Sequence, residues 1–275
     1  MTKKAIEYYI DQKLIFPSIL DNGYRDFSEN DIECLNKIFV FRKLGLSTVE
    51  IKSVLADKTN NTLLKISVHK ELILQREQAK KAILDQLICG KNYSELSKEL
   101  RTIEQSSSVS EKILEAFPGY YGRFICLHFS RFLNEPITTT EQQSAYEEII
   151  AFLDNAPLLQ FTEDLQSFFI ESTKHINTEL IRDMIANTKQ TIEKPDKFLY
   201  ENKEGIERYL AYKQSEEYKN SPIHKIQTIF KEFKKSSGYD DIFIPAMKKL
   251  SVSYSKYCKQ LEIANEKLLS QYPDI

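Results

Sequence analysis

The stretch from Phe117 to Phe124 has the most unusual composition in the second half of the chain. Two of the seven glycines stand here, three residues apart, beside four aromatic side chains. Glycine lets a ligand or a neighbouring helix approach the backbone closely, and aromatic walls with a few hydroxyls suit a planar or apolar small molecule. The expected walls of this ligand site are Tyr120, Tyr121, Phe124, Phe168 and Phe169. Arg123 could meet an acidic group, whereas the alternative is that these aromatics fill the core of a helical bundle.

Patterns for catalysis or metal binding are weak in this sequence. The cysteines stand far apart without a Cys-x-x-Cys pair, which favours neither a soft-metal site nor a disulfide framework: Cys34, Cys89, Cys126 and Cys258. Glu171, His175 and Glu179 could share a helical face, but a solvated polar stripe is the favoured interpretation. There is no nucleophile motif, glycine-rich phosphate loop or paired zinc motif. We therefore predict neither an enzyme nor a cofactor.

Length and composition predict an all-α protein. At 275 residues the chain is long enough for one or two domains with a sizeable core. Seven glycines and eight prolines are few, and strand-like alternation is confined to a hairpin near residue 20. There is no run of eighteen apolar residues and no hydrophobic segment at the N-terminus, so no membrane partner is expected. The cysteine usage suits a reducing cytoplasm.

The first thirty residues predict a helix followed by a tight hairpin. Ile6 and Ile10 share one face of an amphipathic helix over residues 3–10, and we expect Pro17 to end that helix. Asn22-Gly23 is a turn pair because both residues tolerate positive φ.

Two further helices are expected after the hairpin. Ser28 and Asp31 form a capping box for a helix that runs to about Leu44, with Gly45 as its C-terminal cap. A fuller capping box, Ser47-Thr48-Val49-Glu50, starts the next helix. Helix, tight hairpin and helix are the skeleton of a winged DNA-binding unit.

A set of side chains in this region follows one order and spacing: Tyr8-Tyr9, Leu14-Ile15, Pro17, Gly23-Tyr24-Arg25, Phe27-Ser28, Asp31, Leu35, Ile38, Arg42, Leu44-Gly45-Leu46-Ser47 and Glu50-Ile51. This pattern resembles the DNA-binding half of MerR-type transcriptional regulators, and it covers about the first fifth of the chain. The resemblance implies a partial winged helix-turn-helix in residues 1–60 and a dimerisation helix with a fold-back helix in residues 61–104. We expect residues 109–275 to form an all-helical effector-binding domain that the motif does not cover.

The resemblance also implies which residues contact DNA. The helix that enters the major groove would carry Lys3 and Lys4 on its first turn and Tyr9 on its second. Tyr24 and Arg25 would form the wing that holds phosphate, and Arg42 would lie near a second phosphate contact.

Three features depart from the family pattern. Glu7 stands where the family usually has Arg, and Lys13 where it usually has Gly. The helix that begins the family's unit is not represented before Met1, so we expect either a start further upstream or a truncated form. Residues 1–57 hold eight Lys and Arg against nine Asp and Glu, a net charge of −1, although DNA-binding modules are usually basic.

A long helix is expected from Thr62 to Ile88, ended by Gly90. Its apolar residues follow an imperfect seven-residue phase, which fits a coiled-coil seam and an ordinary core helix equally well. A dimer seam on this helix would include Ile73 and Ile83. A short helix over residues 93–104 would fold back on it, and Gln105-Ser106-Ser107-Ser108 is the best linker in the sequence. Helix starts are expected further on, among them Ser110, Pro118, Thr140, Thr162, Asn177 and Ser221.

These observations predict a dimeric, cytoplasmic, one-component transcription regulator. Its partners would be promoter DNA, a second copy of the chain, RNA polymerase through the promoter, and a small effector that is apolar or aromatic. The resemblance implies activation by bending and untwisting an overlong promoter spacer. The alternative is a truncated, dimeric, helical ligand-binding protein that no longer binds DNA, and an enzyme comes third.

Overall fold

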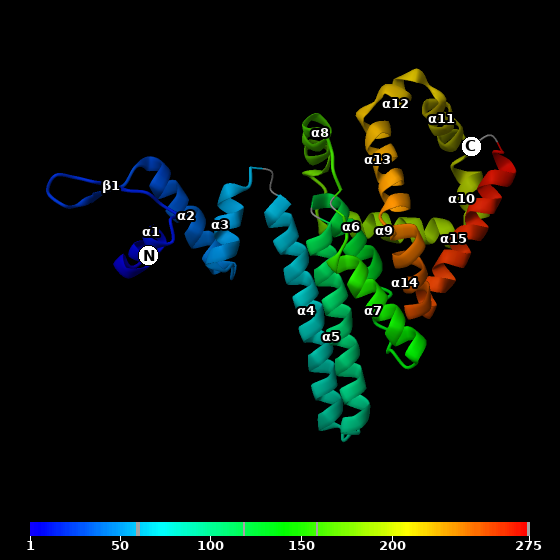
Figure 1. Cartoon of the computed structure of the whole chain (residues 1–275), viewed down its shortest axis with the longest axis horizontal. Coiled ribbons are helices and arrows are strands. Elements are labelled where there is room, and N and C mark those ends of the chain that lie inside the picture. The colour runs from blue at the N-terminus through cyan, green and yellow to red at the C-terminus, as the bar shows by residue number, and fades with distance from the viewer. Residues whose placement is uncertain (59–60, 118, 158, 274–275) are drawn as a thin grey trace. The chain divides into compact units, whose positions relative to one another are not determined.

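The chain folds into two compact units, Met1–Ile66 and Ser67–Ile275. The computed structural model describes residues 1–58, 61–117, 119–157 and 159–273 (Figure 1). The expected helix start at Pro118 and the boundary expected at residue 60 lie outside these described residues. Within the described ranges, no helix is both long enough and apolar enough to cross a membrane.

The first unit contains three helices, a two-stranded hairpin and the start of α4. Its elements are α1 (Lys3–Asp11), β1 (Ser18–Ile19), β2 (Arg25–Asp26), α2 (Glu29–Lys43), α3 (Thr48–Ala56) and the first turns of α4 (Asn61–Ile88). The strands pair antiparallel, with Ser18 opposite Asp26 and Ile19 opposite Arg25.

Local sequence signals set the ends of α2 and α3. Both predicted capping boxes are confirmed, because Ser28 and Ser47 each accept from the backbone three residues on while Asp31 and Glu50 reach back. Gly45 has a φ of 76°, as expected for a residue that ends a helix in the left-handed region.

The end of α1 differs from the expectation. α1 stops at Asp11, six residues before Pro17, so the proline does not end the helix. Lys13 instead adopts a φ of 57°, the one positive φ among the non-glycine residues that the structure describes. The amide of Lys13 donates to the carbonyl of Ile10 at 2.9 Å, and the amide of Leu14 donates to that of Tyr9 at 3.0 Å. This left-handed turn supplies partners for the last helical carbonyls, so the helix needs no proline to end it.

A small core holds the first unit together. Its buried members come from every helix of the unit, from the segment after α1 and from the connection between α2 and α3: Tyr9, Leu14, Ile15, Ile38, Leu46, Ile51, Val54 and Ile66. The hairpin contributes none of these and stands in solvent. The core therefore fixes the three helices, whereas the hairpin depends on its own pairing and turn.

Helices are the regular secondary structure of the described part of the second unit. Its elements after α4 are α5 (Tyr93–Ala116), α6 (Gly119–Ser130), α7 (Thr140–Asp154), α8 (Glu163–Thr173), α9 (Thr178–Glu193), α10 (Pro195–Glu201), α11 (Lys203–Gln214), α12 (Glu216–Asn220), α13 (Pro222–Ser236), the π-helical turn η1 (Tyr239–Phe243), α14 (Ile244–Leu250) and α15 (Val252–Gln271). With the hairpin of the first unit as the sole sheet in the described residues, the predicted all-α class is confirmed.

α4 and α5 form an antiparallel pair, as the sequence predicted (Figure 1). Lys91 pairs with Glu99 at 2.7 Å near the connection, and Arg76 Nη1 donates to Ser107 Oγ at 3.1 Å further along.

The linker expected at residues 105–108 is wrong, because α5 runs through it without a break. Serine is a tolerable helix former when no Gly or Pro accompanies it. The residues that follow, Val109, Ile113 and Leu114, are buried in the core of the second unit, so tertiary packing extends the helix. The expected helix start at Ser110 is wrong for the same reason.

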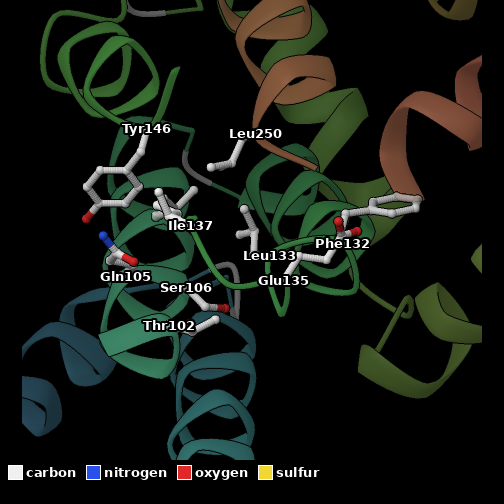
Figure 2. Close-up of a pocket in the computed structure, with 10 residues that line it drawn as sticks. Thr102, Gln105, Ser106, Phe132, Leu133, Glu135, Ile137, Tyr146 and Leu250 are labelled. Atoms are coloured by element: carbon white, nitrogen blue, oxygen red, sulfur yellow. The ribbon is translucent and has the colours of Figure 1, made fainter. Parts of the chain in front are cut away.

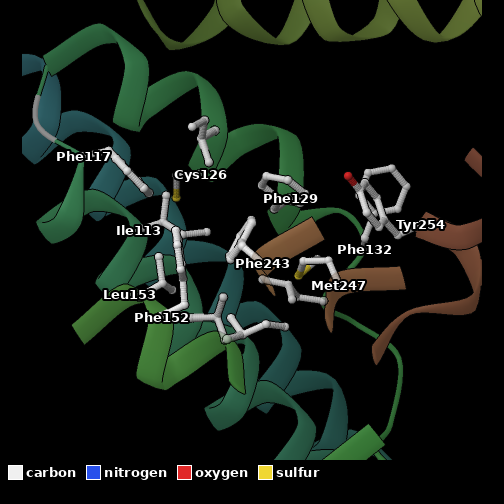
Figure 3. Close-up of a cluster of buried hydrophobic side chains, with 14 of the residues drawn as sticks. Ile113, Phe117, Cys126, Phe129, Phe132, Phe152, Leu153, Phe243, Met247 and Tyr254 are labelled. Atoms are coloured by element: carbon white, nitrogen blue, oxygen red, sulfur yellow. The ribbon is translucent and has the colours of Figure 1, made fainter. Parts of the chain in front are cut away.

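The main core lies among α5, α6, α7, α14 and α15 (Figure 3). Its centre is aromatic, with Phe129 and Phe243 in edge contact at 5.1 Å and Phe152 and Phe243 at 5.3 Å. Phe243 and Met247 are both fully buried in this core.

A carboxylate ties the segment after α6 to the start of α15. Glu135 accepts from the amide of Val252 at 2.9 Å, from the amide of Ser253 at 2.9 Å and from the Ser251 hydroxyl at 2.8 Å. Burial alone would raise the pKa of Glu135, but the hydrogen bonds from these three residues outweigh it and hold that pKa below its ordinary value. The charged form of Glu135 is therefore the one that stabilises the start of the helix.

Candidate DNA-binding surface and ligand groove

Two lysines stand on the exposed first turn of α1. Thr2 caps this helix by accepting from the amide of Ala5 at 3.3 Å, and Lys3 and Lys4 follow it with their side chains in solvent. A helix N-terminus has unpaired amides and a partial positive charge, and the two ammonium groups add to it. This end of α1 is therefore suited to a phosphate.

The structure corrects the expectation for Tyr9. Its side chain is 8% exposed and belongs to the core, whereas Tyr8 is 45% exposed. Successive residues of an α-helix point about 100° apart, so only one of the two can face the core. The Tyr8 hydroxyl lies 3.2 Å from Thr48 Oγ1 on α3. Tyr8, and not Tyr9, is the tyrosine of this pair that a second molecule can reach.

Tyr24 and Arg25 lie on the exposed hairpin. Tyr24 is 72% exposed, and Arg25 forms no ion pair with any residue that the structure describes. The turn is held locally, since the Tyr24 amide donates to Asn22 Oδ1 at 3.1 Å and Gly23 has a φ of 81°. The hairpin thus presents a cation and an aromatic ring on a short turn whose shape is fixed by hydrogen bonds.

Arg42 is partly occupied within its own unit. Its Nη1 donates to the carbonyl of Leu46 at 2.8 Å, across the turn that joins α2 to α3. Five donors are available on a guanidinium, so the remaining ones stay free for an anion.

Two carboxylates of the first unit are held in caps. Asp31 accepts from the Ser28 hydroxyl at 2.6 Å and from the amide of Phe16 at 3.0 Å, and these hydrogen bonds lower its pKa. Glu50 accepts from the amide of Ser47 at 2.7 Å. Two of the carboxylates that contribute to the net charge of −1 of residues 1–57 therefore already accept hydrogen bonds from backbone amides.

Four of the five aromatic residues expected to form ligand walls, Tyr120, Tyr121, Phe124 and Phe169, make ring contacts with other side chains. Tyr120 lies 6.0 Å from Phe169, Tyr121 lies 4.3 Å from Phe230, and Phe124 stacks on His128 at 6.3 Å, all measured between ring centroids. Neither of the two cavities described below includes Tyr120, Tyr121, Phe124, Phe168 or Phe169 in its walls. These contacts favour the alternative, in which the aromatic side chains fill the core of a helical bundle.

The close approach at Gly122 serves the chain itself. A Cβ at this position would stand 1.5 Å from the carbonyl oxygen of Phe117, so only glycine fits here. Its neighbour Arg123 is 1% exposed and donates from Nη1 to the carbonyl of Ile176 at 2.8 Å. Burial lowers the pKa of Arg123, and its Nε and Nη2 find no hydrogen-bond acceptor among the described residues.

A ligand-sized groove lies elsewhere in the second unit. It has a volume of about 850 Å³ and runs between the α4–α5 pair on one side and the end of α6 with α9 on the other. Volumes of this order hold typical small-molecule ligands. Its apolar walls include Leu72, Ile83, Ile103, Leu127 and Ile185.

The second cavity is much smaller and lies beside the groove (Figure 2). Thr102 and Ser106 of α5 line both spaces, and Phe132, Glu135 and Tyr146 close the smaller one. Its volume of about 10 Å³ is at the lower limit for a single water molecule. It is therefore too small for an effector.

Four cations line the large groove, and sequence reasoning did not single them out as a site: Arg76, Arg131, Arg182 and Lys189. One signal was present. Arg131 continues the helical spacing of Phe124, Leu127 and His128, which places a cation directly after the apolar face of α6.

Buried titratable groups near α6 are held neutral. Burial, and then the charge of Arg131, lowers the pKa of His128 to about 4, so the imidazole is uncharged at neutral pH. Burial raises the pKa of Cys126 to about 12, which leaves it an inert thiol.

Comparison with known proteins matches only a minor part of the chain. Residues 1–58 match the MerR HTH family regulatory protein model. The chain is 30% identical over 76 residues to the HTH-type transcriptional activator mta of Bacillus subtilis, a match that covers 27% of this chain and 30% of that protein. It is 37% identical over 57 residues to the HTH-type transcriptional regulator CueR of Yersinia pestis, covering 20% of this chain and 41% of that protein. No solved structure matches the chain with statistical significance.

The family match lies within the first unit and includes its capped helices and its hairpin. The aligned part spans under half the length of both curated relatives. The helix order, both capping boxes and the sequence match agree that residues 1–58 are similar to the DNA-binding unit of MerR HTH family regulatory proteins.

Proposed function

We propose that the protein is a MerR-type transcription regulator that binds promoter DNA through its first unit and a small effector through its second. The observation that carries the proposal is the match of residues 1–58 to the family, on a unit with an exposed hairpin and a lysine-bearing helix start. The overall charge of this unit is the observation that favours the alternative, a helical ligand-binding protein that does not bind DNA.

The proposed DNA contacts follow the exposed cations of the first unit. Lys3 and Lys4 at the start of α1, Arg25 on the hairpin and the free donors of Arg42 would hold phosphates. Tyr24 would pack against the sugar–phosphate backbone. Tyr8 takes the place that the sequence assigned to Tyr9, because Tyr9 is buried.

Binding to DNA is tested by selecting sites from a random duplex library and measuring affinity over a salt series. The wild-type chain is expected to select a pseudo-palindromic site. Arg25→Ala should weaken binding to all sequences and lower the salt slope by about one unit, because one phosphate contact is lost. Arg208→Ala, an exposed arginine of α11 in the second unit, is the matched control and should change neither. A wild-type chain that selects no site would leave the alternative function in place.

We also propose that the bound protein distorts its promoter. A regulator that bends and untwists an overlong spacer aligns both promoter elements for RNA polymerase without adding base contacts. Circular-permutation electrophoresis of the selected site should then show a bend, and transcription with purified polymerase should depend on spacer length. Undistorted DNA in the complex would refute this part alone.

The proposed dimer uses the outer face of α4. Leu74, Leu84 and Ile88 are 58%, 56% and 77% exposed, which leaves an apolar stripe along one long helix. Ile83, expected in the seam, is 4% exposed and packs inside its own unit. Equilibrium sedimentation at micromolar concentration should give a dimer, and a monomer would exclude the proposed seam.

The proposed effector site is the large groove between α4–α5 and α6–α9. The sequence predicted an apolar or aromatic effector, and the aliphatic walls of the groove suit an apolar molecular body. The ring contacts of Tyr120 with Phe169 and of Tyr121 with Phe230 support the groove, rather than the predicted aromatic walls, as the effector site.

A further inference from the structure

The charge of the groove distinguishes it from a purely apolar pocket. Its walls carry Arg76, Arg131, Arg182 and Lys189 against a single acidic residue, Glu99. Glu99 is itself paired with Lys91 at 2.7 Å, which lowers its pKa. The lining of the groove is therefore strongly cationic, although the whole chain has a formal net charge of −2.

Three of these cations have carboxylate partners within the chain. Arg76 lies 3.6 Å from Glu111 and 3.6 Å from Glu77. Arg182 pairs with Glu71, and Lys189 lies 3.7 Å from Glu193. Their charges are largely compensated before any ligand arrives, so a ligand would gain less from them.

Arg131 is different. Its guanidinium lies 4.5 Å from the ring of Phe132 and 4.9 Å from the ring of Tyr257. Its Nη2 is 3.5 Å from Nδ1 of His128, an imidazole that is uncharged at neutral pH. No carboxylate lies within ion-pair distance of Arg131 in the part of the chain that the structure describes, and its Nε is buried without a hydrogen-bond partner there.

A half-buried cation without a counter-ion is costly. Desolvation penalises the charge, and two aromatic rings compensate only in part. Burial lowers the pKa of Arg131 accordingly. An anion placed beside this guanidinium would regain the lost interaction at a partly desolvated charge, where charge-assisted hydrogen bonds are stronger than in bulk water.

We propose that the groove binds an amphipathic carboxylic acid, with its carboxylate on Arg131 and its aliphatic chain along Leu72, Ile83 and Ile185. The aliphatic walls accept the chain, and the serine and threonine hydroxyls of α5 accompany the headgroup. This deepens the effector role proposed above by replacing a neutral apolar ligand with an acidic one. Binding itself requires only the second unit.

The test uses the full chain and three probes that share one alkyl chain: decanoate, decan-1-ol and decyltrimethylammonium. Isothermal titration calorimetry without DNA should show saturable binding of one decanoate per chain. Decanol should bind at least tenfold more weakly, because it has no negative charge to pair with the Arg131 guanidinium. The cationic probe should not bind. Decanol binding as tightly as decanoate, or binding of the cationic probe, would overturn the proposal.

Two variants separate the headgroup site from the apolar walls. Arg131→Gln should weaken decanoate at least tenfold and leave decanol unchanged, whereas Arg131→Lys should recover part of the affinity. Lys225→Gln, an exposed lysine on α13 that does not line the groove, is the matched control. Circular dichroism melting shows whether each variant folds.

Ala186→Trp keeps the proposal testable if Arg131→Gln fails to fold. Ala186 lines the groove but is exposed, so a large side chain there should block the groove without disturbing the core. Decanoate binding should be lost, and retained binding would refute the site. A chain that binds DNA but no decanoate contradicts this inference alone, and one that binds decanoate but no DNA contradicts the regulator proposal alone.

Discussion

Lys13→Gly should stabilise the first unit. Lys13 holds the left-handed turn after α1 with a φ of 57°, a conformation that costs a residue with a Cβ roughly 1–2 kcal/mol. Its side chain is exposed, so its removal deletes little packing. Glycine loses more backbone entropy on folding, which offsets roughly 0.5–1 kcal/mol of the gain. The net expectation is a stabilisation of about 0.5–1 kcal/mol.

The gain is measurable as a shift in melting temperature. In a unit of this size, 1 kcal/mol corresponds to about 4–8 °C, so the transition of the first unit should rise by roughly 2–8 °C. Differential scanning calorimetry resolves that transition from the melting of the second unit if the two unfold separately. Urea unfolding followed by circular dichroism gives an independent free energy of unfolding.

Lys13→Ala is the matched control. Alanine removes the lysine side chain but keeps a Cβ, so the backbone cost remains and no rise is expected. Lys13→Asn should fall between the two, because asparagine tolerates the left-handed region better than most residues. Equal melting temperatures for the glycine and alanine variants would refute the assignment of strain to this turn.

Four further variants test the second unit. Glu135→Gln should destabilise it by about 1–2 kcal/mol at pH 7, because the charged cap of α15 is lost. Since the pKa of Glu135 is lowered in the folded state, its contribution is complete above the unfolded pKa and is lost as the pH falls through the folded pKa. Melting curves of wild type and variant that fail to converge with acid would contradict this. Arg123→Met should change the free energy of unfolding by less than about 1.5 kcal/mol in chemical denaturation, because it removes a buried, poorly partnered charge; a loss above 3 kcal/mol would show that the single bond to Ile176 dominates. Leu84→Glu should yield folded monomers in sedimentation, whereas Ile83→Glu should unfold the unit by burying a charge; the reverse pattern would place the seam on the other face of α4.

The N-terminal elements could be predicted because their signals are local. A serine followed three residues later by Asp or Glu satisfies the free amides of a helix start with atoms close in sequence, and both predicted boxes formed at Ser28 and Ser47. Gly45 and Gly90 likewise ended helices through their own backbone conformations. These devices need no knowledge of the rest of the fold.

Other predictions were wrong because the deciding partner is distant in sequence. The serine run at residues 105–108 carries a linker composition, yet the core contacts of α5 keep it helical. Tyr8 and Tyr9 are identical in type, and only the position of the small core decides which one is buried.

The sequence by itself determined the similarity of residues 1–58 to MerR regulators, the helical class and the capped helices of the first unit, because each rests on residues within a few positions of one another. Tertiary structure alone decided where a cavity lies. The aromatics around Tyr120 found partners among α8 and α13 and closed the space that the sequence suggested. The groove arose instead where four helices meet, and its cations come from residues as far apart as Arg76 and Lys189. Such a cavity is a property of side-chain packing between distant segments, which no local pattern specifies.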